Sequence, residues 1–107
     1  MSKFILLAIL AAFTSPAFAD AIARQGSDWV RITASACTDA EVLERIAAAS
    51  PGDKNAHLDF RAGTSSFQGQ LYVHCWRPAG NVIHLMYGDG DQGIVPVGEL
   101  KPDNGSI

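Results

Sequence analysis

A glycine- and aspartate-rich stretch near the C-terminus, YGDGDQGIVP (Tyr87–Pro96), is the part of the chain that most suggests ligand chemistry. Its aspartates could coordinate a cation, and its glycines could let the backbone approach a phosphate. The spacing argues against both. A calcium loop that began at Asp89 would put Gly93 and Leu100 where oxygen ligands are needed. A phosphate loop needs a Gly-Lys-Ser/Thr sequence and a following helix, and the stretch provides neither.

The same residues are well suited to a tight turn. Asp-Gly and Gly-Asp pairs readily take the positive backbone angles of short hairpin loops. We therefore predict a structural hairpin turn formed by Asp89, Gly90, Asp91 and Gly93, with Asp89-Gly90 or Gly90-Asp91 at its tip. We predict no metal ion and no cofactor at this position.

The histidines are the other candidates for chemistry. Structural zinc sites use four ligands, and pairing the cysteines in a disulfide removes the two best ones. His74 and His84 are expected to be a stacked, partly buried pair. His57 stands near Asp59, a pairing too common to define a catalytic triad. No serine lies in a nucleophile elbow, so we expect no catalytic residues, with a small hydrolase or cell-wall enzyme based on His57 or His74 as the alternative.

The N-terminal residues indicate export. Lys3 precedes an apolar run, Phe4–Phe13, and the small residues of Ala17–Ala19 follow. This run is shorter than the roughly 20 residues that cross a bilayer, and the pattern is typical of a cleaved signal peptide. We expect cleavage after Ala19, a periplasmic or secreted protein, and no stable membrane anchor in the mature chain.

The cysteines support the same compartment. The chain has two, Cys37 and Cys75, and an even number in an exported protein predicts a disulfide. The alternative is a pair of buried free thiols.

The formal charge is −3 and the arginines are scattered along the chain, whereas nucleic-acid binding needs concentrated positive charge. We therefore expect no nucleic-acid partner.

Periodicity predicts the elements. Alternation predicts strands over residues 28–37, 57–63, 70–77 and 81–88, and a last short strand over 93–100. The spacing of Thr38 and Glu41 suits a capping box for one helix, which Ser50-Pro51-Gly52 would stop. We predict an α+β domain over residues 29–101: an antiparallel meander of four to five strands, one helix after the first strand, and one disulfide. Residues 1–19 form the signal peptide, 20–28 a loose mature N-terminus and 102–107 a flexible tail in this interpretation.

The register of the central hairpin decides which residues share a face. If the cysteine face is the core, Cys75 must oppose an odd-numbered residue, which a three-residue loop, Pro78-Ala79-Gly80, would achieve. The opposite face would then carry Tyr72, His74, Trp76, Val82, His84 and Met86. That set is unusually apolar for a solvent-facing side of a sheet. Either the chain's own segments cover it, or a partner protein or second copy does, or it holds a small molecule or metal.

Two resemblances follow from these segments. The signal peptide, ACTDAEVLERI, LYVHCW and VIHLMYGDGDQGIVPVGEL together resemble a group of small exported proteins of proteobacteria and their prophages. The most distinctive pieces are Cys37-Thr38, Cys75-Trp76 and Asp89–Gly93. This resemblance implies export and a disulfide and carries no activity over to the chain. Separately, GIVPVGEL (Gly93–Leu100) is similar to the closing segment of Src-homology-3-like binding barrels, in which a single helical turn follows the proline.

These observations favour a non-catalytic exported binding or interaction protein, with prophage origin as one option. Its partner would be a protein or a second copy, contacted through the predicted hairpin face. The alternatives are the small periplasmic hydrolase or cell-wall enzyme, an envelope-acting inhibitor or exclusion factor, and a Src-homology-3-like binding barrel.

Overall fold

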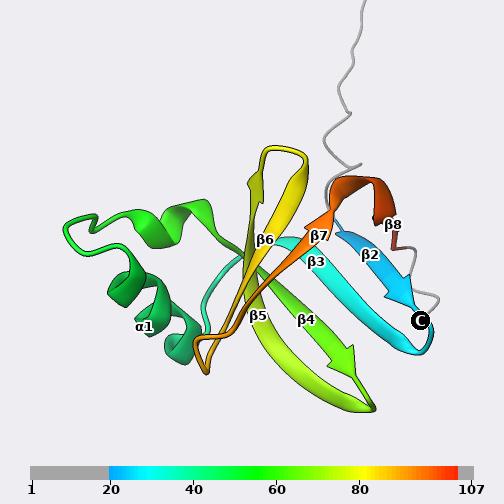
Figure 1. Ribbon diagram of the computed structural model, residues 1–107. Coiled ribbons are helices and arrows are strands. Elements are labelled where there is room, and N and C mark those ends of the chain that lie inside the picture. The colour runs from blue at the N-terminus through cyan, green and yellow to red at the C-terminus, as the bar shows by residue number, and fades with distance from the viewer. Residues whose placement is uncertain (1–19, 104–107) are drawn as a thin grey trace, which may run out of the picture.

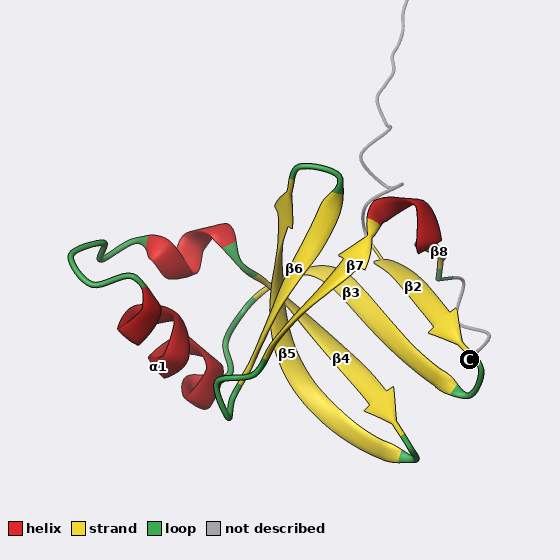
Figure 2. Cartoon of the chain, viewed as in Figure 1, coloured by secondary structure: helices red, strands yellow, loops and turns green. Residues whose placement is uncertain are grey.

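The computed structural model describes residues 20–103, and the predicted signal peptide and most of the predicted tail lie outside this range. Within it the chain forms one antiparallel sheet of seven strands, together with one α-helix and two short 3₁₀ helices (Figures 1 and 2). The strands are β2 (Asp20–Gln25), β3 (Asp28–Ala36), β4 (Arg61–Phe67), β5 (Gln70–Ala79), β6 (Val82–Tyr87), β7 (Gln92–Pro96) and β8 (Lys101–Pro102). The helices are α1 (Ala40–Ala49) and the 3₁₀ helices η3 (Ala56–Asp59) and η4 (Val97–Glu99).

The sheet follows the chain in order and then returns to its start. Each strand from β2 to β7 pairs with the next, and β8 pairs with β2 through Ala21–Pro102 and Ile22–Lys101. The result is a half-barrel with β7 and β8 at its two edges (Figure 1). The predicted meander of four to five strands with a helix after the first strand was therefore wrong. Residues predicted to be a loose N-terminus form β2, and α1 follows the second described strand.

Curvature gives the sheet two buried faces. The inner face carries one apolar cluster, formed by Ala21, Ala23, Val30, Ile32, Trp76, Ile83, Leu85 and Val95. The outer face carries a second cluster around Cys75 and Met86, which α1 and η3 cover with residues such as Val42, Ile46 and Phe60. Each face of the central strands is thus buried by a different part of the same chain.

Helix α1 is fixed to the outer face by its cap and by a covalent bond. Asp39 is the N-cap, and its Oδ1 accepts a hydrogen bond of 3.0 Å from the Val42 amide, so the predicted Thr38 cap was wrong by one residue. The predicted Cys37–Cys75 disulfide is present and joins the segment before α1 to β5. A disulfide of this kind indicates an oxidising, extracytoplasmic compartment. In residues 20–103, no helix is long and apolar enough to span a membrane.

The central hairpin has a different register from the predicted one. Its loop is the residue pair Gly80-Asn81, since Ala79 pairs with Val82. Gly80 has a φ of 67° and Asn81 is not among the positive-φ residues, as in a type II′ turn. Because this loop has an even number of residues, Cys75 opposes the even-numbered Met86, whereas an odd-numbered partner was predicted.

This register divides the predicted contact face. Tyr72, His74 and Trp76 point to the inner face, since Trp76 pairs with Leu85 and both belong to the inner cluster. Val82, His84 and Met86 point to the outer face, because Met86 belongs to the outer cluster. His74 pairs with Tyr87 and His84 with Arg77, so the predicted histidine pair does not form. The six residues cannot act as one surface.

Candidate functional site: a groove on the inner face

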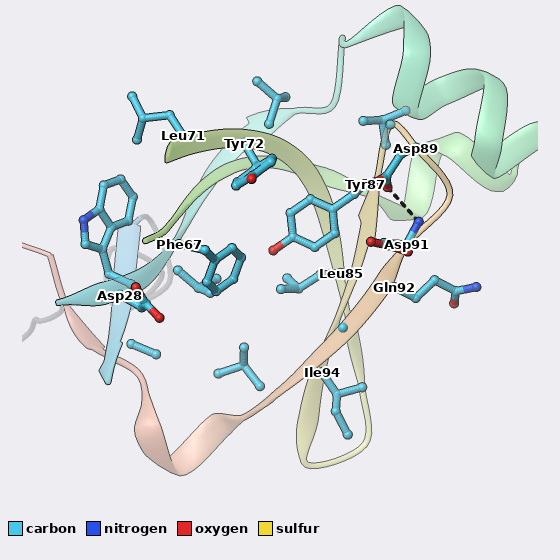
Figure 3. A pocket seen from close by; sticks show the side chains of 18 of the residues that line it. Asp28, Phe67, Leu71, Tyr72, Leu85, Tyr87, Asp89, Asp91, Gln92 and Ile94 are labelled. Carbon is cyan, nitrogen blue, oxygen red and sulfur yellow. Dashed lines mark hydrogen bonds between the residues drawn. The ribbon is translucent and has the colours of Figure 1, made fainter. Parts of the chain in front are cut away.

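A groove of about 880 Å³ opens where the inner face is not filled by the apolar cluster. Its walls are the β2–β3 hairpin, the tip of the β4–β5 hairpin, the β6–β7 turn, strand β7, the start of α1 and the helical turn η4. Figure 3 shows Phe67 of β4, Tyr72 of β5, and Leu85 and Tyr87 of β6 directed toward this space. We call it the inner groove. Its volume falls within the range of small-molecule and peptide sites in proteins.

Three aromatic rings form the floor of the inner groove. Ring centroids lie 6.0 Å apart for Phe67 and Tyr72, 6.4 Å for Phe67 and Tyr87, and 6.5 Å for the edge-on pair Tyr72 and Tyr87. Phe67 is 37% exposed and Tyr72 is 42% exposed. Large exposed aromatic surface of this kind is characteristic of binding sites, because these side chains lose little entropy on contact.

A buried polar network supports the floor. The Ser65 hydroxyl lies 2.8 Å from Nδ1 of His74 and 2.8 Å from the Tyr87 hydroxyl. Ser65 and His74 are both 0% exposed, and the His74 and Tyr87 rings meet edge to face at 5.5 Å. These contacts fix the direction of the Tyr87 ring, so the aromatic floor is held before any ligand arrives.

Burial sets the protonation of this network. Desolvation lowers the pKa of His74 to about 4, because Nε2 has no hydrogen-bond partner among the described residues and a charged ring would leave it unpaired. Burial also raises the pKa of Tyr87, and the hydrogen bond between Ser65 and Tyr87 opposes that shift. At neutral pH both side chains are uncharged, and the network is a structural support.

Carboxylates surround the aromatic floor. The charged residues that line the groove are one arginine and six acids: Arg24, and Asp28, Asp39, Glu41, Asp89, Asp91 and Glu99. Some have local partners: Asp28 Oδ1 accepts from the Gln68 amide at 3.0 Å, and Asp39 caps α1. The excess of acids gives the groove a negative potential that would attract cationic groups.

The β6–β7 turn is built from the residues that first suggested chemistry. The Gly90 amide donates to the Tyr87 carbonyl at 3.0 Å, and Gly90 has a φ of 94°. Asp89 Oδ1 accepts from the Asp91 amide at 2.9 Å (Figure 3). Helix α1 holds the turn from the other side, since Arg45 Nε donates to the Gly88 carbonyl at 2.9 Å. In the part of the chain that the structure describes, no group of three or more His, Cys, Asp or Glu side chains could hold a metal ion.

The two histidines that suggested a hydrolase, His57 and His74, lie in different parts of the fold. His74 faces Ser65 and Tyr87 in place of an aspartate, and both Ser65 and His74 are inaccessible to a substrate. His57 and Asp59 are exposed in η3, on the covering layer of the outer face and away from the inner groove. The arrangement of these residues can support packing but provides no accessible nucleophile beside a base.

Only some of the site residues predicted from the sequence line the inner groove. Tyr72 and the turn residues Asp89, Asp91 and Gly93 line it, whereas Trp76 and Met86 are buried in the two apolar clusters. Phe67, Tyr87 and Asp28 were not predicted as site residues. Their signal in the sequence is weak. Strand β4 was predicted to end before Phe67, and Tyr87, as an odd-numbered residue of the central hairpin, was predicted to lie on the cysteine face.

No protein-family model, no curated protein and no solved structure matches this chain.

Proposed function

We propose that this is a non-catalytic exported binding protein whose inner groove holds a polypeptide segment. The observation that carries the proposal is the exposed aromatic floor of Phe67, Tyr72 and Tyr87, held in place by the buried network beneath it. An open groove bounded by strands and turns can accommodate a chain that enters at one end and leaves at the other. Aromatic-lined grooves are a common way to recognise such segments.

The disulfide and the N-terminal sequence support an exported location. The Cys37–Cys75 bond supports an extracytoplasmic compartment. We propose that export uses residues 1–19 as a cleaved signal peptide, so the mature protein is periplasmic or secreted and begins at Asp20, the first residue of β2. Intact mass of the protein recovered outside the cytoplasm tests this proposal, because a mass that includes residues 1–19 would contradict it.

One observation favours the alternative of a Src-homology-3-like binding barrel, which would also be a binding protein. Strand β7 ends at Pro96, the helical turn η4 follows, and β8 then pairs with β2. The helical turn expected after the proline from the resemblance to Src-homology-3-like barrels is therefore present. The likeness is confined to this closing segment.

Selection from a random heptapeptide library tests the proposed function. The library is selected on the mature protein, and enriched peptides are measured against Tyr72→Ala. Leu58→Ala is the matched control, because Leu58 is 65% exposed in η3 and does not line the groove. We expect binding to the parent and to Leu58→Ala, and a loss of about tenfold or more in Tyr72→Ala, as for an aromatic anchor. A library with no enriched peptides, or peptides insensitive to Tyr72, would overturn the proposal.

A further inference from the structure

Strand β7 has one hydrogen-bonding edge with which no other strand of residues 20–103 pairs. Its sheet neighbour is β6 alone. The Tyr87 amide donates to the Asp91 carbonyl at 2.9 Å, and the Val97 amide donates to the Asn81 carbonyl at 3.0 Å. Hydrogen bonding alternates along an antiparallel pair, so Gly93 and Val95 also face β6. The backbone groups of Gln92 and Ile94 therefore point away from the sheet.

This free edge borders the inner groove. Gln92, Gly93 and Ile94 are among the residues that line the groove. Ile94 is 67% exposed, and its side chain points away from the groove, as Figure 3 shows. Its backbone is therefore the part of Ile94 that a ligand in the groove can reach. Among residues 20–103, no hydrogen bond from another element reaches the outward amide of Ile94.

The other edge of the sheet is protected. Strand β8 is two residues long and ends with Pro102, which has no amide hydrogen to donate. Natural sheets commonly protect their edges with short strands and prolines of this kind. The contrast identifies β7 as the edge left open for pairing, next to an aromatic floor.

We propose that an extended polypeptide segment with Lys or Arg at alternate positions binds by adding to the free edge of β7 as a further strand. This inference rests on the proposed function and specifies its ligand. Backbone groups of Gln92 and Ile94 would make the main-chain hydrogen bonds. Alternate side chains of an added strand point to the same face, so every second ligand residue would lie over the inner groove.

The lining of the groove selects the charge of those side chains. Six acids and one arginine line it, and the floor is aromatic. A Lys or Arg side chain can lay its carbon chain on Tyr72 or Phe67, place its charge over a ring, and reach a carboxylate such as Asp91. An acidic ligand would meet like charge at the same positions. The same argument disfavours a second copy of this chain, because β7 itself contains no Lys or Arg to place over the acidic groove.

Two variants at one position separate backbone pairing from side-chain contact. Ile94→Pro removes the outward amide hydrogen, and Ile94→Ala is its matched control, which removes the exposed side chain and keeps the amide. Proline is tolerated at strand edges where the amide faces away from the sheet. For a basic heptapeptide enriched from the random library, we expect about tenfold weaker binding to Ile94→Pro than to Ile94→Ala, as for loss of a main-chain hydrogen bond. Equal binding to both variants overturns strand addition and leaves groove binding intact.

A change on the ligand keeps the test valid if Ile94→Pro does not fold. Each amide of the same heptapeptide is N-methylated in turn and binding to the parent protein is measured. Strand addition predicts that alternate positions lose about tenfold or more and that the intervening positions tolerate the methyl group. A uniform profile overturns the proposal. Failure to enrich any peptide would instead overturn the proposed function itself.

The charge of the ligand is tested separately. Replacing Lys or Arg by Glu at alternate positions of the heptapeptide should abolish binding. The Asp89→Asn/Asp91→Asn protein keeps the Oδ1 acceptor of the turn and should bind the parent peptide several-fold less tightly, with a weaker dependence on salt. Enriched peptides without basic residues, or a dimer in sedimentation equilibrium that these peptides do not dissociate, would overturn the cationic ligand.

Discussion

Gly63 of β4 lies directly opposite His74 of β5, and a Cβ atom on Gly63 would stand 2.1 Å from Nε2 of the imidazole. It would also stand 2.6 Å from the carbonyl oxygen of Arg31 on the next strand. The buried imidazole and the backbone of β3 therefore occupy the space that any side chain at position 63 would need. His74 can therefore pack beneath the aromatic floor only because residue 63 has no side chain.

Gly63→Ala should be strongly destabilising. The added methyl group would force the His74 ring or strand β3 to shift, and overpacking of this kind costs about 1–3 kcal/mol of unfolding free energy. Gly98→Ala is the control, since a Cβ there meets nothing within 4 Å and the position has no positive φ. Urea denaturation should show a clear loss for Gly63→Ala and little change for Gly98→Ala. Equal stability of the two variants would contradict the close packing described here.

Stability should fall below neutral pH because of His74. The unfolded chain takes up a proton near the ordinary pKa of 6.5, whereas the folded protein takes it up only near 4. The lowered pKa means that the stability contribution of the neutral ring is complete above 6.5. It falls by up to about 1.4 kcal/mol per pH unit between 6.5 and 4, and changes no further below 4.

Two measurements check this behaviour. NMR titration of the His74 ring should show no change until the pH approaches 4. Urea denaturation across the same range should show the loss in the parent and in His57→Gln, because His57 is exposed. A His74 resonance that titrates near 6.5 would contradict the burial of this ring.

Removing the disulfide should weaken the domain and loosen the β6–β7 turn. The bond closes a loop with a sequence separation of 38 residues, which corresponds to about 3–4 kcal/mol of unfolding free energy on the chain-entropy model. The Cys37→Ala/Cys75→Ala protein and the reduced parent should lose similar amounts in urea denaturation. Hydrogen exchange should speed up in α1, whose Arg45 contacts the turn at Gly88. A parent protein with two reactive thiols after denaturation would contradict the bond.

Trp76 and Tyr72 should respond differently although both lie on β5. Trp76 is buried, and its indole N–H donates to the Thr33 and Ala62 carbonyls at 2.9 and 3.0 Å. Trp76→Ala should therefore cost about 3–5 kcal/mol of unfolding free energy. Tyr72→Ala should cost much less, because its ring is half exposed. If Trp76→Ala matched Tyr72→Ala in urea denaturation, Trp76 would belong to a contact surface as the sequence first suggested.

The local elements could largely be predicted from the sequence. Helix α1, the disulfide and the two central strands follow from apolar periodicity, the cysteine count and β-branched residues. Strand β2 could not be recognised, because Ala21, Ile22 and Ala23 are all buried and the alternation typical of a half-buried strand is absent. The C-terminal half of strand β4 could not be recognised because its residues are polar. Ser65 can be buried there because its hydroxyl is hydrogen-bonded to His74 of β5 and Tyr87 of β6, and these partners are not evident from the sequence of β4.

The candidate site could not be predicted because one assumption decided which residues were expected on each face of the sheet. The disulfide face was taken as the single core, which required an odd-numbered loop between β5 and β6. The sheet instead curves and buries its other face as well, so the Gly80-Asn81 loop is compatible with burial of both Cys75 and Trp76. Curvature arises from all the strands together and leaves no signature in any single segment.

The pairing of β8 with β2 has a consequence for the order of folding. All the remaining strand pairs join consecutive strands of the chain, so those contacts can form early at low loop-closure cost. The contacts of Ile22 with Lys101 join opposite ends of the described chain, and the ion pair of Arg31 with Asp103, at 2.7 Å, likewise ties the C-terminal end back to β3. These contacts should form after the transition state. Substitutions at this junction would therefore speed unfolding and leave the folding rate nearly unchanged.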